Sequence, residues 1–446
     1  MDGPRLRTEE GRIRSRVVLG SISVLLVIGG AAGATYFVHA HRRRTITLHP
    51  TRGARASHPP AFVVVASSPA AGQHAVKFAP LIRVQFSQPL ARRWARPTLT
   101  PAIPGSWMRI GPAVLEFRPK ANFVPSTKVT LAIVGGKAGV RDHAGGVLAR
   151  SYRASFVIAE GSVLRLQQLL AELGYLPLDF EGATSVTLGS THTVARAAPL
   201  PPFAGASSSS SALAKGPTHA VESQTTTITS PPSSRAQIAT ATLDPEATSS
   251  GAVELTPEPG SFSWRYPSIP SSLAVAWQPG VETALVRGAV MAFQSADGIP
   301  ADGDAGSEVW TALLKAIAKR QVTTAPYDYL EVTTTSPETL SVWRDGKVIY
   351  QSLANTGIPE EPTAPGTYTV YLRYASTTMS GYNPNGSHYS DPGVPYVAYF
   401  NGGDAVHGFL RAQYGYPQSL GCVELAYANA AVVFNYDPIG TLVNVA

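Results

Sequence analysis

Cysteine is almost absent from this chain, because Cys422 is the only one among its 446 residues. A single thiol excludes an internal disulfide, so packing must stabilise the folded parts. It also excludes a zinc site built from several cysteines, and the scattered histidines show no metal-ligand spacing, so we expect no metal and no cofactor. Cys422 is therefore either an inert buried residue or a reactive nucleophile.

Charged residues are also scarce, at 15 per cent, and the net charge is +7. The basic residues form no stripe with interleaved aromatic residues, so the sequence predicts no nucleic-acid partner. Glycine and proline are frequent, with 40 and 37 residues. This composition favours β-rich modules joined by linkers, and a chain of this length is expected to hold about two to four domains.

One stretch, residues 17–40, contains no charged side chain and has arginines on both sides. Its length matches the roughly 20 apolar residues that cross a bilayer. We therefore expect a cytoplasmic tail at 1–16, a single-pass transmembrane anchor at 17–40 in the cell membrane, and a linker at 41–61, with the rest of the chain outside the cytoplasm. A cleaved signal peptide is the alternative.

Residues 62–160 contain short alternating apolar runs separated by proline, glycine or aspartate, which predicts a β-sandwich. The runs cover residues 81–86, 113–117, 128–134 and 155–158. This segment resembles a bacterial immunoglobulin-like (Ig-like) module, through residues 68–72, 101–107 and 117–119. No set of residues there has catalytic character, so we interpret it as a spacer or adhesion module.

Residues 161–320 have helical periodicity in two pieces. Val163, Leu166, Leu170 and Leu173 share one helix face, and further helices are predicted at 286–294 and from Ser307. Between them, about 182–260, lies a Ser- and Thr-rich insertion that we expect to be disordered. The two pieces resemble a small three-helix peptidoglycan-binding module. A helical spacer that binds nothing is the alternative.

Residues 324–446 are β-rich again. Runs at 330–335 and 340–343 alternate, and Arg344-Asp345-Gly346 before 347–350 is a strong hairpin signal. Further strands are predicted at 368–374 and at 394–400. The fold class expected for the whole chain is therefore multidomain and mainly β, with a transmembrane helix at the N-terminus.

This last domain also holds Cys422 and, fifteen residues before it, His407. A thiol near its ordinary pKa is mostly protonated at neutral pH, so a nucleophilic cysteine needs a base. Gly421 permits a tight turn in which the N–H groups of Leu420, Gly421 and Cys422 could bind a developing oxyanion. The combination favours nucleophilic catalysis over an inert packing role.

The same domain resembles the L,D-transpeptidase catalytic domain of the YkuD type. The matching residues are His407-Gly408, Ser419-Leu420-Gly421-Cys422, Asn355-Thr356-Gly357, the turn from Thr363 to Tyr368, and Gly440 to Val443. The resemblance implies an enzyme that cross-links peptidoglycan stem peptides at the bacterial membrane, with a donor tetrapeptide and an acceptor stem as partners. Cys422 would form a thioester with the donor, and His407 would transfer protons.

The resemblance also implies supporting roles. The Gly408 carbonyl would orient His407, Ser419 would support the loop, and Tyr389 would contact substrate. Two positions depart from the family pattern. Leu420 replaces a histidine, for which His388 is a candidate substitute, and Glu424 replaces an arginine or asparagine.

Glu424 should raise the pKa of Cys422 unless it is paired, for instance with Arg411 or Arg373, and it could select the charged stem group that is accepted. Two other functions stay open at this point. One is a non-catalytic wall-binding scaffold with a decayed site, and the other is an L,D-carboxypeptidase that uses the same cysteine. The sequence carries no indication of the oligomeric state.

Overall fold

The structure is a computed structural model that describes residues 60–183 and 254–446. The anchor expected at 17–40 and most of the insertion expected at 182–260 lie outside the described residues. Within the described ranges, no helix is long and apolar enough to span a membrane. The described part is multidomain and mainly β, with strands from Val64 to Val445 and five helices among them.

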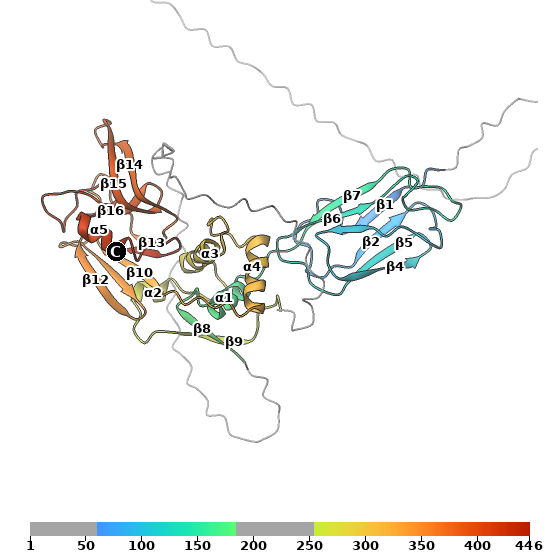
Figure 1. The fold of residues 1–446 in the computed structure, drawn as a ribbon, viewed down its shortest axis with the longest axis horizontal. Helices are drawn as coiled ribbons and strands as arrows, with labels where there is room; N and C mark the ends of the chain where they lie inside the picture. The colour runs from blue at the N-terminus through green and yellow to red at the C-terminus, as the bar shows by residue number, and fades with distance from the viewer. Residues whose placement is uncertain (1–59, 184–253) are drawn as a thin grey trace, which may run out of the picture. The chain divides into compact units, whose positions relative to one another are not determined.

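The first domain is a sandwich of two antiparallel sheets (Figure 1). One sheet has the order β1-β2-β5-β4 and the other has the order β3-β6-β7. The strands are β1 Val64–Ser68, β2 Ile82–Phe86, β3 Thr98–Thr100, β4 Gly105–Gly111, β5 Val114–Pro119, β6 Lys128–Ile133 and β7 Tyr152–Val157. In β2 every second residue is fully buried, as the alternating sequence predicts, and these side chains join one apolar core.

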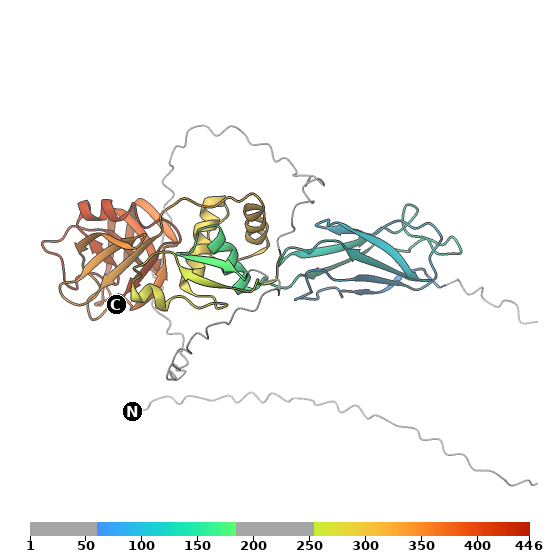
Figure 2. The same cartoon turned by 90° about the horizontal axis from the view of Figure 1, so that it is seen from below.

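Three main helices follow, and all three were predicted from the sequence: α1 Val163–Glu172, α3 Ala284–Asp297 and α4 Ser307–Ala318. Their apolar faces share one core, to which Leu170, Leu285 and Trp310 contribute fully buried side chains. The sequence did not predict the short helix α2 Ser271–Val275 or the ribbon of β8 Leu178–Gly182 and β9 Gly260–Trp264, which lies beside these helices (Figure 2).

Residues 254–260 belong to the folded part of the chain, although the prediction placed them inside the insertion that ends at about 260. Leu255 is buried in the helical core. Arg165 of α1 forms a 2.8 Å ion pair with Glu258, and Gln168 exchanges hydrogen bonds with the backbone of Glu258 at 2.8 and 3.0 Å. These contacts fix residues 254–260 on α1, which a purely local reading of polar composition could not show.

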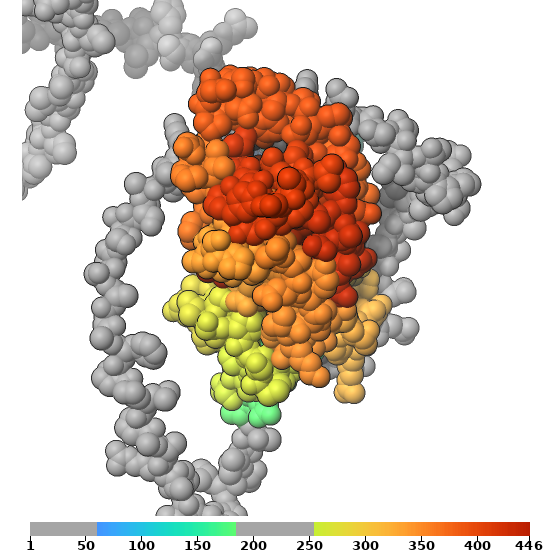
Figure 3. Space-filling model, turned by 90° about the vertical axis from the view of Figure 1, so that its left-hand side faces the viewer, coloured from blue at the N-terminus to red at the C-terminus, as the bar shows by residue number. Residues whose placement is uncertain are grey.

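The C-terminal domain contains two sheets, with orders β12-β11-β10-β18-β13 and β14-β15-β16-β17. The elements are β10 Asp328–Thr333, β11 Thr339–Arg344, β12 Lys347–Leu353, β13 Gly366–Thr369, β14 Leu372–Tyr382, β15 His388–Asn401, β16 Asp404–Gly408, β17 Val423–Leu425, α5 Tyr427–Val433 and β18 Leu442–Val445. Both sheets and α5 contribute to one buried core that includes Leu330, Val406 and Val443. Figure 3 shows one face of this domain in orange and red.

The hairpin predicted at Arg344-Asp345-Gly346 is confirmed, and Asp345 and Gly346 have φ of 48° and 91° as a type I′ turn requires. The single strand predicted at 368–374 was wrong. Val370 donates its N–H to Thr441 O at 2.8 Å, whereas Tyr371 donates to Tyr399 O at 3.0 Å. Consecutive residues thus bond to different sheets, and the run divides into β13 and β14.

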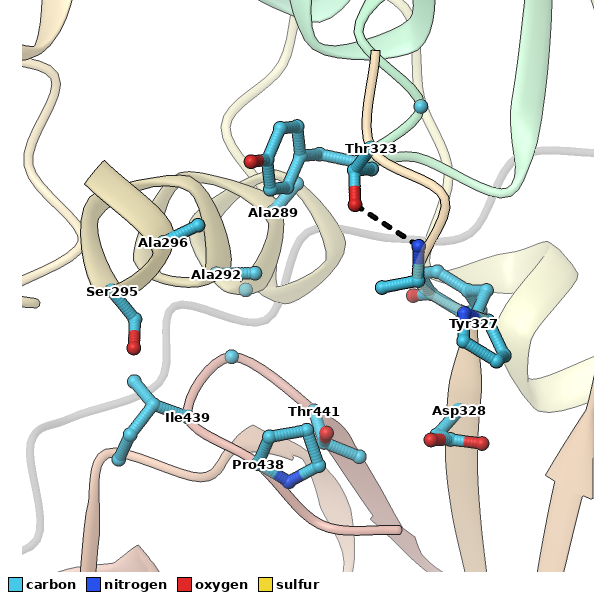
Figure 4. A pocket seen from close by; sticks show the side chains of 16 residues that line it. Ala289, Ala292, Ser295, Ala296, Thr323, Tyr327, Asp328, Pro438, Ile439 and Thr441 are labelled. Carbon is cyan, nitrogen blue, oxygen red and sulfur yellow. Dashed lines mark hydrogen bonds between the residues drawn. The ribbon is translucent and has the colours of Figure 1, made fainter. Parts of the chain in front are cut away.

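Helix α3 packs directly on the C-terminal domain, where two glycines let the backbones approach. A Cβ on Gly288 would lie 2.5 Å from Gly440 O, and one on Gly440 would lie 2.7 Å from Ala292 N. Figure 4 shows the hollow beside this contact, which is lined by Ala289, Ala292 and Ala296 of α3 and by Pro438, Ile439 and Thr441 of the turn before β18. Tyr329, Trp343 and Leu442 of the C-terminal domain are buried in the helical core.

Candidate active site

The candidate site lies where β16 and β17 run parallel to each other. His407 of β16 is in register with Glu424 of β17, and Cys422 directly precedes β17. Side chains alternate along a strand, so Cys422, Glu424 and His407 emerge on one face of the sheet. All three line one pocket of about 280 Å³. The remaining lining residues are Met379, Asn383, Tyr389, Asp391, Val394, Phe409, Arg411, Gln418, Ser419 and Leu420.

His407 is buried, with 3% of its surface exposed, and its Nδ1 lies 3.1 Å from the carbonyl oxygen of Gly408. A carbonyl oxygen only accepts, so Nδ1 carries the proton and Nε2 keeps a lone pair. Burial lowers the pKa of His407, although the Gly408 contact opposes this effect. The imidazole is therefore neutral near pH 7, in the tautomer that can accept a proton at Nε2.

Cys422 is held as a neutral thiol in the resting site. Burial raises its pKa above the ordinary value, and the nearby carboxylates Asp404 and Glu424 raise it further. Its Sγ lies 3.8 Å from the carbonyl oxygen of Gly403, a contact in which the thiol donates. The thiol must therefore lose its proton to a base as it attacks, and His407 is a neutral imidazole on the same pocket wall.

Hydrogen bonds fix the turn that carries Cys422. Ser419 Oγ donates to Cys422 O at 2.6 Å, and Thr363 Oγ1 donates to Gly421 O at 2.8 Å. Gly421 has φ of +102°, and a Cβ there would lie 2.3 Å from Asp404 Oδ1. Only glycine fits this position, as the sequence predicted for a tight turn. The oxyanion role of the three N–H groups in the turn stays a prediction.

Thr363 contacts the turn directly, and Glu338 acts on it through Thr356, whose carbonyl oxygen accepts from the Ser419 N–H at 3.0 Å. Sequence reasoning missed both Thr363 and Glu338 as site residues. Thr363 Oγ1 also accepts from the Gly357 N–H at 2.9 Å. Glu338 is fully buried and accepts from the N–H and the hydroxyl of Thr356 at 2.6 and 2.8 Å. Thr363 belongs to the turn that carries the family resemblance, which was the one available signal. No local pattern marks Glu338.

Glu424 is paired, so its charge is compensated. Its two carboxylate oxygens accept from Nε and Nη2 of Arg411, both at 2.7 Å. Arg411 is one of the two partners that the sequence offered. The other, Arg373, instead forms a 3.0 Å ion pair with Asp437. Because both oxygens of Glu424 are engaged with Arg411, the two side chains line the pocket as an ion pair. The substrate-binding role expected of Glu424 stays a prediction.

Tyr389 lines the pocket, whereas His388 does not. Burial and the neighbouring Cys422 raise the pKa of Tyr389 to about 12, so its hydroxyl stays protonated. His388 precedes it on β15 and therefore projects from the opposite face, where its ring lies edge-on to Tyr382 at 5.4 Å. His388 is thus wrong as a substitute for the missing histidine. Leu420 lies on the pocket wall.

The comparisons with known families agree with this architecture. Residues 327–445 match the family model of the L,D-transpeptidase catalytic domain of the YkuD type. Residues 57–157 match the model of the bacterial Ig-like domain. The chain therefore carries an L,D-transpeptidase catalytic domain and a bacterial Ig-like domain, and both resemblances seen in the sequence are confirmed.

The solved structures to which this chain is similar include several L,D-transpeptidases. One from Mycobacterium smegmatis is 13% identical, with a TM-score of 0.25, and the match covers 86% of this chain and 99% of that chain. The catalytic domain from E. faecium is 25% identical, with a TM-score of 0.25, over 28% of this chain and 100% of that chain. L,D-transpeptidase 3 from Mycobacterium tuberculosis, in complex with a faropenem-derived adduct, is 14% identical, with a TM-score of 0.24. The match covers 86% of this chain and 97% of that chain. No curated protein matches this chain.

Proposed function

We propose that this protein is a peptidoglycan L,D-transpeptidase that joins stem peptides through a thioester on Cys422. The observation that carries the proposal is the shared pocket. Cys422, His407 and the hydrogen-bonded turn 419–422 meet there, inside the domain that matches the L,D-transpeptidase catalytic model. The pocket lies at the surface and is roomy enough, at about 280 Å³, to admit a peptide segment.

In the first half-reaction, Cys422 Sγ attacks the L-centre carbonyl carbon of a donor tetrapeptide. His407 Nε2 takes the thiol proton, the carbon–nitrogen bond to the terminal D-residue breaks, and the imidazolium returns the proton to the leaving amine. In the second half-reaction, an acceptor amine attacks the thioester carbon and loses a proton to His407. The carbon–sulfur bond then breaks and the thiol is restored.

The electrostatics of the site support this sequence of proton transfers. Because burial raises the pKa of the thiol and lowers the pKa of the imidazole, a resting thiolate–imidazolium pair is disfavoured. The proton should instead move as the sulfur–carbon bond forms, when negative charge passes to the carbonyl oxygen. The Gly408 carbonyl, 3.1 Å from Nδ1, then stabilises the transient imidazolium.

The proposed location is the outer side of a bacterial membrane, with residues 17–40 as the anchor. The proposal rests on the uncharged run and its flanking arginines. Fractionation of cells that make the full chain should find it in the membrane fraction, and protease added to spheroplasts should degrade it. A mature N-terminus that begins after residue 40 would contradict the anchor.

The experiment that tests the reaction uses the full chain with a tetrapeptide muropeptide, with and without an acceptor stem, and identifies the products by mass spectrometry. We expect cross-linked dimer and released D-residue, and neither product with Cys422→Ser. Release of the D-residue without dimer, even at high acceptor concentration, would indicate a carboxypeptidase. Normal binding to sacculi without any product would indicate the scaffold.

A further inference from the structure

Asp391 is the one charged residue of the Cys422 pocket whose charge no neighbouring side chain balances. Three charged residues line this pocket, namely Asp391, Arg411 and Glu424. Arg411 and Glu424 form an ion pair with two hydrogen bonds, so their opposite charges cancel. Within residues 60–183 and 254–446, Asp391 has neither a hydrogen bond nor an ion pair to any side chain. With Cys422 and His407 neutral, the pocket wall carries a net charge of about −1.

The position of Asp391 places this charge beside the reacting groups. It lies two residues after Tyr389 on β15, on the same face, and both line the pocket. Its carboxylate is near enough to act on His407 and Arg411, as a minor contribution in each case to the pKa of the group. The side chain is half-buried, so water screens it less than a fully exposed carboxylate.

Arg411 does not balance Asp391, because its guanidinium is already engaged. Nε and Nη2 donate to Glu424, Nη2 also donates to Gln418 O at 3.1 Å, and the group stacks 4.7 Å from the centre of the Phe409 ring. This fixed arrangement holds the cation on the β17 side of the pocket. Asp391 therefore offers a carboxylate to a ligand that brings its own positive charge.

We propose that Asp391 binds the ammonium group of a stem peptide and so selects stems that carry a free amine close to the reacting carbonyl. This inference rests on the proposed function, whose second half-reaction consumes an amine. Stem peptides that contain a diamino acid bring such a group either on the donor or on the acceptor. An ammonium group and a half-buried carboxylate form a charge-assisted hydrogen bond, which is roughly twice as strong as one between neutral groups.

A binding measurement tests the proposal without requiring turnover. The full chain with Cys422→Ser is titrated calorimetrically with a diamino-acid tetrapeptide, and then with the same peptide acetylated on its side-chain amine. Adding Asp391→Asn should weaken binding of the free-amine peptide by about 10- to 100-fold and leave the acetylated peptide unchanged. Glu360→Gln removes the same charge from an exposed residue outside the pocket and serves as the matched control.

Turnover then distinguishes donor from acceptor. With Cys422 restored, Asp391→Asn lowers kcat/KM for release of the terminal D-residue if the donor ammonium is bound. It shifts products from dimer toward hydrolysed stem if the acceptor ammonium is bound. Equal affinities in the Asp391→Asn and Glu360→Gln variants, for both peptides, would overturn the assignment of Asp391. Absence of all product from the otherwise unaltered chain would instead contradict the proposed function.

Discussion

Two hollows of similar size border the C-terminal domain, and their charged groups are arranged differently. The hollow beside α3 has a volume of about 250 Å³ and is lined mainly by small and apolar residues (Figure 4). Its one carboxylate, Asp328, accepts two hydrogen bonds of 2.6 Å from Arg344. The Cys422 pocket holds a similar ion pair, but it adds a thiol, an imidazole and the unbalanced Asp391. The volume of a hollow therefore does not mark the candidate active site in this domain, whereas the thiol, the imidazole and the uncompensated carboxylate do.

The largest effect should follow from Cys422→Ser. A serine hydroxyl is far harder to ionise than a thiol and His407 alone cannot activate it to the same degree, so acylation should fall by on the order of 10⁴-fold or more. The measurement is the rate of D-residue release by the full chain. Circular dichroism should show an unchanged fold, and retention of most of the activity would contradict the role of Cys422.

His407→Gln should come next, with a loss of about 10²- to 10⁴-fold in acylation rate because no base then accepts the thiol proton. In the unaltered protein, burial lowers the pKa of His407 below the ordinary value of about 6.5. The acylation rate should therefore stay constant as the pH falls through about 6.5, and it should decline only near the lower pKa of the folded protein. Stability should follow the same sign. The unfolded chain takes up the proton first, so the folded state loses stability as pH falls below about 6.5.

The two ion pairs allow a matched comparison. Arg411→Gln leaves Glu424 buried without a cation, and Arg344→Gln does the same to Asp328; the carboxylate side chains are 5% and 6% exposed. Each should lower the free energy of unfolding by on the order of 3 kcal/mol. Only Arg411→Gln should also slow acylation, since the bare carboxylate of Glu424 raises the pKa of Cys422 further. Equal effects on acylation by the two variants would contradict this distinction.

Thr363→Val should have a smaller effect that still reaches the site. It removes the hydroxyl that joins the Gly357 N–H to Gly421 O, leaving both backbone groups without this partner, which costs about 1–3 kcal/mol. We expect kcat to fall more than KM rises, because the turn that carries Cys422 loosens. Thr363→Ser keeps the hydroxyl and should restore most of the rate.

The smallest effect on activity is expected at the other hollow. Gly440 has φ of +95°, and a Cβ there would meet Ala292 N at 2.7 Å. Gly440→Ala should therefore destabilise the chain by more than ~1 kcal/mol. Acylation by the protein that remains folded should be unchanged, because this contact lies outside the Cys422 pocket. Thermal unfolding and a carbapenem-labelling rate, measured on the same sample, separate the two outcomes.

Local sequence signals predicted the elements whose cause is local. The periodicity of residues 163–173 predicted α1, and Asp345-Gly346 predicted the β11–β12 hairpin. The same rules could not divide 368–374 into β13 and β14, because alternation shows which residues face a core but not which sheet each backbone N–H joins. They also missed the pairing of β8 with β9, whose partners lie on either side of residues 184–253.

The candidate site divides in the same way. Cys422, His407 and Gly421 could be predicted because their residue types and spacing are unusual. Thr363, Glu338 and Asp391 could not, because each has its role through contacts or charge balance that only the folded chain creates. Glu424 shows the difference most clearly. In the sequence it is a carboxylate of the wrong sign beside the thiol, and in the fold Arg411 compensates it.

The central claim is that the partly buried, protonated thiol of Cys422 still accepts an acyl group. Intact-mass measurement of the full chain after incubation with a carbapenem tests it most directly. The account predicts a single covalent adduct that peptide mapping places on Cys422 and that is absent from Cys422→Ser. An unmodified mass after prolonged incubation of correctly folded protein would contradict it.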